Sequence, residues 1–372
     1  MKHYPTARPH ITKWDERHVL EALRSGILSI GPYIEKFEKK FARVVGTKYA
    51  CAVSSGTAGL HLALIAAGIG KGDEVITTPF SFVASANAIL YVGAKPVFVD
   101  IDPVTYNIDP AKIEARITKR TKAIMPVHIF GQPAQMDAIM NIAKKHKLVV
   151  IEDACESLLS TFKGKRAGTF GQSAVFAFYA NKQMTTGEGG MLVTDDKRID
   201  ALCRSLRNQG RAPNMQWLDH DRLGYNYRMD EMSAALGLSQ LKNIKFLIRK
   251  RRELAGWYTK ALAPLSHLVT VPKTARKATN TWFVYVIALK NAKLGRDALI
   301  EKLKKRGVHT RPYLPSIHLF KFYRSLGYKK DACPVSVATS KRTLALPFYI
   351  GLTKRDVACI AKILKDTMTN AI

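Results

Sequence analysis

Between residues 48 and 194 the sequence alternates short apolar, β-rich runs with helical stretches, and this alternation limits the fold more than any other feature. Seven runs are expected to be strands: 49–54, 74–78, 95–100, 122–128, 148–153, 174–178 and 191–194. Helical patterns occupy 58–67, 82–91, 110–117 and 136–146 between several of them. Such alternation is typical of an α/β fold with a mostly parallel sheet covered on both faces. The last two runs are too close together for a crossover helix, which predicts that one of them runs antiparallel.

The C-terminal part of the sequence has a different pattern, which predicts a second domain. Residues 208–228 show no clear period and are expected to form a long ordered loop. Asp230 then opens a helical pattern that extends to about residue 262, and a helix of this length typically links two lobes. The later pattern predicts a smaller α+β domain, from apolar runs at 281–289 and 345–347 and helices at 296–306 and 354–368. We expect a large domain over 1–245, whose N-terminal segment packs on the small domain, and a small domain over 246–372.

Composition places the chain among soluble globular proteins. Its residues are 47% hydrophobic and 24% charged, and no apolar run reaches the roughly 18 residues that a membrane-spanning helix needs. The first residues contain no apolar segment of a secretory signal. The five cysteines are scattered and form no C-x-x-C pair, which favours free thiols in a reducing compartment, the cytoplasm, over a disulfide framework or a zinc site.

The net charge of +30 is high, and alone it fits nucleic acid, anionic lipid or a phosphorylated substrate. The densest basic run, Arg249 to Arg252, falls inside the long helical pattern, so we interpret it as a solvated helix face. The other lysines are dispersed and lack the interleaved aromatic residues of a single-strand binder. No nucleic-acid partner is predicted.

Three short motifs follow predicted strands, where ligands of open α/β sheets gather. Gly56, Thr57 and Ala58 form a small turn that opens a helix, and such a turn suits a phosphate, although an ordinary helix cap is the alternative. Neither a P-loop nor a G-x-G-x-x-G motif is present. Asp153 ends the fifth run, where it needs a cationic partner unless it is only a helix cap. Lys182 follows the sixth run and is either a surface loop residue or an amine activated by desolvation.

Together these motifs predict a pyridoxal phosphate (PLP) site. A phosphate cradle, a carboxylate for the pyridinium nitrogen and an amine that forms a Schiff base are what this cofactor requires. Phe82, after the second run, is expected to stack on the cofactor ring, with core packing as the alternative. The glycines that follow Lys182, namely Gly187, Gly189 and Gly190, predict a tight turn packed against the cofactor or a partner subunit.

With these motifs in place, the sequence resembles the DegT/DnrJ/StrS group of PLP-dependent sugar aminotransferases, of the aspartate-aminotransferase fold type. The resemblance covers nearly the whole chain and rests on the order and spacing of these blocks: GPYIEKFEKKFA, SSGTAGLHLAL, FSFVASANAI, AKPVFVDID, KAIMPVHIFGQPAQMD, VVIEDACES, GKRAGTFG, NKQMTTGEGGMLVTDD and LGYNYRMDEMSAALGLSQL. It implies a fold type I transferase, with a large domain around a seven-stranded sheet and a smaller C-terminal domain.

The resemblance also implies roles for single residues. Lys182 matches the Schiff-base lysine, Asp153 the partner of the ring nitrogen, Phe82 the stacking aromatic, and Gly56, Thr57 and Ala58 the phosphate turn. Asn226 matches an asparagine that reaches the phosphate in the neighbouring subunit, which implies a homodimer with shared active sites. Glu156 stands near the cofactor where many members have glutamine or histidine, and Ala177 replaces a serine that binds the phosphate. Arg311, Tyr313 and His318 lie in a block that approaches the sugar in relatives.

The implied reaction is the transfer of an amino group from L-glutamate, which leaves as 2-oxoglutarate, to a keto sugar attached to a nucleoside diphosphate. Glu156 and its context favour a 4-keto sugar, and the amino sugar would serve polysaccharide or secondary-metabolite synthesis. A PLP-dependent sugar dehydratase is an alternative, but such members carry histidine where this chain has Lys182. A DNA-binding regulator is another alternative, although no helix-turn-helix block is present. No metal site is expected, because the cysteines lack the clustering of an iron–sulfur enzyme.

Overall fold

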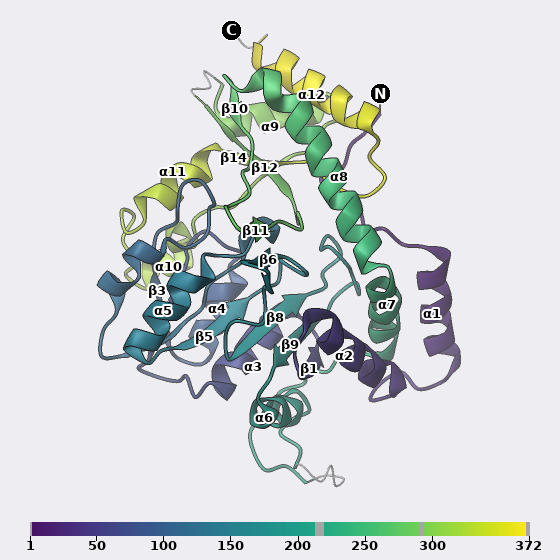
Figure 1. Ribbon diagram of the computed structural model, residues 1–372, viewed down its shortest axis with the longest axis vertical. Coiled ribbons are helices and arrows are strands. Elements are labelled where there is room, and N and C mark those ends of the chain that lie inside the picture. Colours follow the sequence, from purple (N-terminus) through teal and green to yellow (C-terminus); the bar gives the residue numbers. More distant parts are fainter. Residues whose placement is uncertain (1, 213–218, 291–293, 370–372) are drawn as a thin grey trace.

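A seven-stranded sheet forms the centre of the larger part of the molecule (Figure 1). The computed structural model describes residues 2–212, 219–290 and 294–369. The strands are β1 (Tyr49–Val53), β2 (Glu74–Thr77), β3 (Lys95–Phe98), β4 (Thr121–Ile124), β5 (Val149–Asp153), β8 (Ser173–Ala177) and β9 (Gly190–Thr194). Each strand overlaps a run that the sequence predicted as a strand, and the α/β fold is confirmed.

The strand order is β1-β9-β8-β5-β4-β2-β3. β9 runs antiparallel to both of its neighbours, while the β8–β5, β5–β4, β4–β2 and β2–β3 pairs are parallel. The prediction that one of the last two strands is antiparallel is therefore confirmed. The carboxyl ends of the other six strands lie at one edge of the sheet, and β9 begins at that same edge.

Helices cover both faces of this sheet, as its apolar strands require. One face packs against α3 (Gly56–Ala66), α4 (Ala84–Tyr91) and α6 (Lys197–Arg207), through side chains such as Val53 and Val175. The other face packs against α2 (Pro32–Val45), α5 (Met136–His146) and α7 (Glu231–Lys242). Alternate residues of each strand face opposite layers, so Ala174 and Val175 contribute to different cores.

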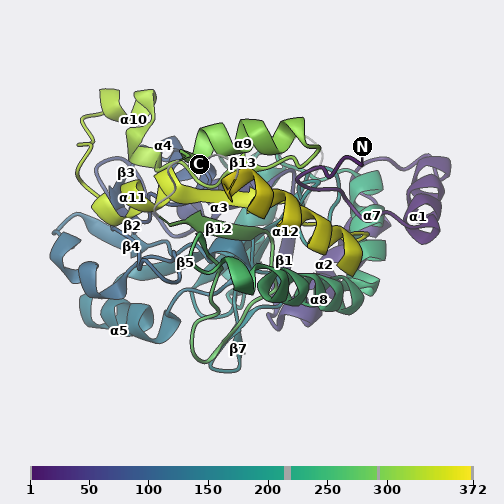
Figure 2. The ribbon, with the colours of Figure 1, turned by 90° about the horizontal axis from the view of Figure 1, so that it is seen from above.

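A smaller antiparallel sheet lies in the C-terminal part, in the order β10 (Val269–Thr270), β12 (Tyr285–Leu289), β14 (Thr343–Leu346) and β13 (Arg311–Pro312). Figure 2 shows α12 (Lys354–Thr369) lying beside α8 (Ile244–Leu262) over this sheet, with α9 (Arg296–Lys305) nearby. Near the N-terminus, Tyr4 forms a bridge with Val308 and packs in the same core. The domain boundaries remain a prediction.

The long helix predicted from Asp230 to about residue 262 is wrong as a single element. Asp230 caps α7 by accepting the Ser233 N–H at 2.8 Å, as the sequence predicted for the helix start. The helix ends at Asn243, whose φ of −99° and ψ of 6° leave the helical region, and α8 then begins. Asparagine is a poor residue for a helix interior because its side chain competes for backbone hydrogen bonds. The expected helix at 110–117 is likewise two single 3₁₀ turns, Pro110–Lys112 and Glu114–Arg116.

The remaining elements are short or peripheral. They are α1 (Lys13–Arg24), α10 (Lys321–Ser325), α11 (Pro334–Arg342), 3₁₀ turns at Ile129–Gly131, Ala263–Leu265 and Ile317–Leu319, and a three-stranded sheet of β6 (Thr161–Phe162), β7 (Lys165–Arg166) and β11 (Ala278–Thr279). The predicted loop at 208–228 falls partly outside the described residues, since 213–218 are not among them. Among the helices that are described, none is both long and apolar enough to cross a bilayer.

Candidate active site

The strand register brings the three predicted motifs to one edge of the large sheet. In β9, Gly190 pairs with Val53, the last residue of β1, and also with Ala177, the last residue of β8. One strand further along, Asp153 at the end of β5 pairs with Val175. The turn before α3, the loop that carries Lys182 and the carboxylate of Asp153 therefore leave the sheet side by side, as expected for ligands at strand carboxyl ends.

The turn that opens α3 is tightly packed. The Ser55 side chain accepts the Ala58 N–H at 3.1 Å, so the helix-cap alternative is present and occupies one donor. The N–H groups of Gly56 and Thr57 belong to the first turn, whose donors have no intrahelical partners and suit an anion. A Cβ on Gly56 would lie 2.8 Å from the Cβ of Ala177 and 3.0 Å from the Sγ of Cys155. The turn thus offers donors and leaves no room for a larger residue at position 56.

The carboxylate of Asp153 lies in the interior, with 5% of the residue exposed. Its Oδ2 accepts the Ser85 hydroxyl at 2.7 Å, and its Oδ1 accepts the Cys155 N–H at 3.2 Å. Turns, and no helix, follow β5, so the alternative of a helix-cap aspartate is wrong. Sequence reasoning missed Ser85, which stands in the first turn of α4 and whose place in the FSFVASANA block was the available signal.

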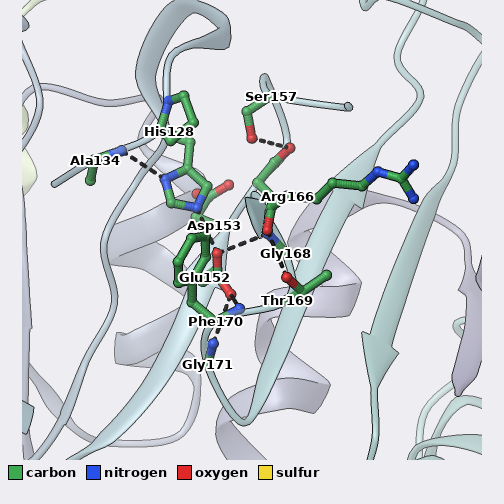
Figure 3. Close-up of polar contacts among 12 residues, drawn as sticks. His128, Ala134, Glu152, Asp153, Ser157, Arg166, Gly168, Thr169, Phe170 and Gly171 are labelled. Atoms are coloured by element: carbon green, nitrogen blue, oxygen red, sulfur yellow. Dashed lines mark hydrogen bonds and ion pairs between the residues drawn. The ribbon is translucent and has the colours of Figure 1, made fainter. Parts of the chain in front are cut away.

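The residue before Asp153 anchors the same strand end from the opposite side (Figure 3). The fully buried Glu152 carboxylate accepts the N–H groups of Gly168, Phe170 and Gly171 at 2.7–2.8 Å. It also contacts Nε2 of His128 at 2.8 Å, and since Nδ1 of that ring accepts the Ala134 N–H, Nε2 is the donor. A carboxylate with four donors is satisfied without solvent. This network holds the end of β5, and with it Asp153, in place.

Lys182 lies in the interior of the site and not on the surface, so the surface-loop alternative is wrong. Only 13% of its side chain is exposed. Its Nζ lies 3.5 Å from Oε1 of Glu156 and 4.1 Å from the centre of the Phe283 ring. The amine is held between an acid and an aromatic face, at the sheet edge that Asp153 also occupies. Sequence reasoning missed Phe283, which comes from the entry to the small sheet, 101 positions along the chain.

Glu156 is a buried acid whose protonation is sensitive to its surroundings. Its Oε2 accepts the Phe130 N–H at 2.8 Å. Burial raises its pKa above the usual 4.5, and although Lys182 and the Phe130 N–H lower the pKa, burial together with the charge of Asp153 prevails. The Gln183 side chain also donates to the Glu156 backbone carbonyl, which ties the two loops together.

Replacing Glu156 with glutamine is expected to stabilise the cofactor-free protein at pH 7 and to leave it unchanged below pH 4.5. Because the folded-state pKa is raised, the wild type loses stability as the pH rises from 4.5 through that pKa, by about 1.4 kcal/mol for each unit of the shift. Glutamine resembles the neutral carboxyl group and removes this loss. Urea unfolding of both proteins between pH 4.5 and 8 measures the difference.

Glu114→Gln serves as the matched control, for which the expected change in stability at neutral pH has the opposite sign. Its exposed carboxyl group has a lowered pKa, because Lys145 and His146 donate hydrogen bonds to it. The stability that this carboxylate adds is present at neutral pH and is lost as the pH falls through its folded pKa. The control variant should therefore have a slightly lower free energy of unfolding than the wild type at pH 7. A Glu156→Gln difference that does not change with pH would contradict the assignment.

The other predicted site residues differ in how closely they approach Lys182. Tyr313 packs against Phe283 and against Phe130, whose N–H donates to Glu156. Burial and the charge of Glu156 raise the pKa of Tyr313. His318 is fully buried, between the Ser316 hydroxyl and the Lys330 carbonyl. These polar contacts do not include Lys182 or Glu156, and a contact of His318 with the sugar remains a prediction.

Two predicted cofactor residues lie on the surface. Phe82 is 62% exposed, so the alternative that it packs in the core is wrong, and its ring is accessible for stacking. Asn226 is also exposed and forms a bridge with Asn208. Neither observation tests the predicted cofactor contacts, but each side chain is accessible to a cofactor or to a second subunit.

The glycine cluster after Lys182 differs from the prediction. A Cβ on Gly190 would lie 2.5 Å from the carbonyl oxygen of Ser55, so this glycine packs against the turn before α3 of the same chain. Gly189, at φ +152°, packs against Thr186 and Met229, whereas Gly187, at φ +82°, has no atom within 4 Å of the position of a Cβ. Gly189 and Gly190 thus pack closely against other residues of the same chain. Gly187 instead provides the positive φ that the turn requires.

The residues of the site suit a PLP molecule. The crowded turn at Gly56 offers phosphate donors, Asp153 offers a carboxylate to the ring nitrogen, and Lys182 offers an amine to the aldehyde. In the sequence, residues 9–365 match the model of the DegT/DnrJ/EryC1/StrS aminotransferase family. The chain belongs to this family. It is a PLP-dependent aminotransferase, and the predicted family and cofactor are confirmed.

Similar proteins agree with this assignment. The chain is 42% identical to the GDP-perosamine synthase of Caulobacter vibrioides, over 94% of both chains. Its fold matches Spr1654 of Streptococcus pneumoniae in its PMP form, with a TM-score of 0.94, 26% identity and 99% of both chains covered. It also matches DesI, solved in the presence of its TDP-sugar product, with a TM-score of 0.90 and 32% identity over 100% of this chain and 94% of the other. In the part of the chain that is described, no group of three His, Cys, Asp or Glu residues is placed to hold a metal ion.

Proposed function

We propose that this aminotransferase moves the amino group of L-glutamate to a nucleotide-linked deoxy sugar that carries a keto group at carbon 4. The observation that carries the proposal is the Lys182 amine, which lies 3.5 Å from Glu156 at the sheet edge shared with Asp153 and the Gly56 turn. The names of the relatives, a GDP-perosamine synthase and an enzyme solved with a TDP-sugar product, support a nucleotide-linked sugar.

Asp153, Lys182 and Glu156 have separate roles in the proposed amino transfer. PLP, when bound, supplies the electron sink that makes the α-proton of the amino donor acidic. Asp153 would hold the ring nitrogen protonated, because its carboxylate is buried and already oriented by Ser85. Lys182 would bind the cofactor aldehyde through Nζ and, once released, would move a proton between the substrate carbon and the cofactor as a general base. Glu156 lies close enough to Nζ to exchange a proton with it.

The test has two arms. Adding L-glutamate to the purified protein should bleach its visible PLP band, and a panel of nucleotide-linked 3-keto and 4-keto sugars should then restore it with formation of an amino sugar detected by mass spectrometry. Restoration by 4-keto sugars alone supports the full proposal. Restoration by 3-keto sugars alone, or loss of water from the sugar without amino transfer, would contradict it.

We further infer a homodimer whose two active sites each use Asn226 of the neighbouring subunit. Three large apolar side chains on segments that carry site residues are each more than half exposed: Phe82 before α4, Tyr91 at its end and Tyr179 in the Lys182 loop. Exposed apolar surface of this kind marks an interaction site. Asn226 is itself exposed on the described chain and is accessible to a second copy.

Mixing two variants of low activity tests the shared site. Asn226→Asp should place a negative charge beside the cofactor phosphate and reduce activity more than about tenfold, since like-charge contacts cost several kcal/mol. Lys182→Ala removes the amine. In a random mixture of the two, half of the dimers are hybrids with one intact site, and activity should recover to about a quarter of the wild type. No recovery in a mixture that forms hybrid dimers would show that each site is complete within one chain.

A further inference from the structure

One arginine of the basic run on α8 does not lie on a solvated helix face. Arg249 and Arg252 are exposed, as predicted, but Arg251 is only 5% exposed. Burial lowers the pKa of its guanidinium to about 10. Among the described residues, no carboxylate lies within ion-pair distance of this cation. A buried charge without a counter-ion needs other compensation, so its hydrogen bonds indicate its role.

Backbone carbonyl groups compensate the charge of Arg251. Its Nη2 donates to the Lys182 carbonyl at 3.0 Å. Its Nη1 donates to the carbonyls of Phe283 at 3.0 Å and of Trp282 at 3.3 Å. One planar guanidinium thus joins α8 to the loop that carries Lys182 and to the segment that enters the small sheet. The rigid fork of arginine suits such simultaneous contacts better than a lysine ammonium does.

The two segments that Arg251 joins also meet at the reactive amine. The Phe283 ring lies under Nζ of Lys182 at 4.1 Å, while Arg251 holds the backbone of both residues. The other side of the amine faces Glu156. Arg251 therefore fixes both the backbone from which the Lys182 side chain extends and the Phe283 ring that its Nζ contacts. Movement of either segment would shift Nζ relative to its acid.

We propose that Arg251 is a positioning residue that sets the place of the Lys182 amine by holding the Lys182 and Phe283 backbones together. It acts through Lys182 and does not touch the substrate, and the proposal rests on the role proposed for Lys182. A displacement of about 1 Å of a reacting group can reduce a rate by about 100-fold. Loss of the guanidinium contacts should consequently reduce the rate of the chemical steps more than the affinity for substrates.

The experiment compares Arg251→Met and Arg251→Lys with the wild type. Lysine keeps the charge but has only one donor group to share among the three carbonyls. We expect kcat to fall about 10- to 100-fold in Arg251→Met, with KM for glutamate changed less than about threefold, and a smaller loss in Arg251→Lys. The rate at which added PLP produces the visible band in cofactor-free protein should fall in parallel, because this step reports the reach of the Lys182 amine directly.

Two control variants separate positioning from stability. Arg249→Met removes an exposed charge from the same helix and should leave both rates unchanged. Leu254→Ala truncates a buried α8 side chain and should lower Tm without changing a contact to the Lys182 loop. If its Tm falls as much as that of the Arg251 variants, its kcat should still be close to that of the wild type. The proposal is overturned if Arg251→Met, folded and binding PLP, keeps kcat and the rate of band formation within twofold of the wild type. The proposal is also overturned if Leu254→Ala loses as much kcat and as much of the rate of band formation as Arg251→Met does.

Failure of this inference is distinguishable from failure of the proposed function. If Lys182→Ala still forms the visible band and transfers amino groups, the role of Lys182 is wrong and the proposal on Arg251 falls with it. If Lys182→Ala is inactive while the Arg251 variants behave as the wild type does, only the inference about Arg251 is wrong.

Discussion

Lys182→Ala is expected to reduce amino transfer by at least about 10³-fold, since the variant loses both the covalent partner of the cofactor and the proton carrier. The structure makes this side chain difficult to replace. Its amine lies between Glu156 and Phe283, and among the described residues no second lysine forms an ion pair with that acid. Single-turnover measurements with L-glutamate, followed through the absorbance of the cofactor, give the rate of this step directly.

Two controls accompany Lys182→Ala. Lys163→Ala removes a lysine that pairs with Asp137 away from the site, and it should retain normal activity. A small primary amine added to Lys182→Ala should restore part of the rate, because the space left by the side chain adjoins the reacting atoms. A variant that retains more than about a tenth of the wild-type rate would exclude Lys182 as the general base.

Asp153→Asn is expected to have the second-largest effect, a loss of about 10²–10³-fold in kcat, because the carboxylate would no longer stabilise a protonated ring nitrogen. Asparagine has the same shape and can still accept the Cys155 N–H that Oδ1 accepts in the wild type. The loss should therefore reflect charge and not misfolding. It is measured as kcat for both half-reactions, with circular dichroism to check the fold.

Ser85→Ala is the graded control for Asp153. It removes the 2.7 Å hydrogen bond to Oδ2 but leaves the carboxylate and its charge in place. Its effect should be about tenfold, since the loss of one hydrogen bond to a charged group costs from about 1.5 kcal/mol upward and the charge itself remains. If Asp153→Asn were no slower than Ser85→Ala, the carboxylate would have no charge-specific role at the ring nitrogen.

The sequence predicted most of the large sheet because its signals are local. Apolar runs such as 148–153 and the turn residues after them report the period and the ends of each strand without knowledge of what packs on them. The two strands around Lys182 were correctly expected to include an antiparallel one, since a short connection leaves no room for a crossover. Asn243 shows the limit of this approach. The apolar periodicity continues through it, so one residue of low helix propensity was not enough to predict the break between α7 and α8.

The candidate site was predictable to the extent that its residues follow strands or match family motifs. Asp153, Lys182 and the Gly56 turn meet these conditions, and the strand register does bring their segments together. Phe283 does not, because a phenylalanine in an apolar run carries no local sign of a role. Ser85 lies within the family block FSFVASANAI, but a serine in a helix has no local feature that distinguishes it from the other residues of that block. Arg251 was predicted on a solvated face because it belongs to a run of four basic residues in a helical pattern. Only the packing of α8 on two distant segments buries it.

The sequence by itself thus determined the fold class, the family and the residue types that the chemistry needs, because periodicity, turn residues and motif order are properties of neighbouring positions. Only the tertiary structure decided what surrounds the reactive amine. Glu156, Phe283 and Arg251 lie 26, 101 and 69 positions from Lys182 and contact its side chain or its backbone. Burial and charge depend on distances in space, so the raised pKa of Glu156 and the buried cation behind Lys182 follow from packing that no local pattern encodes.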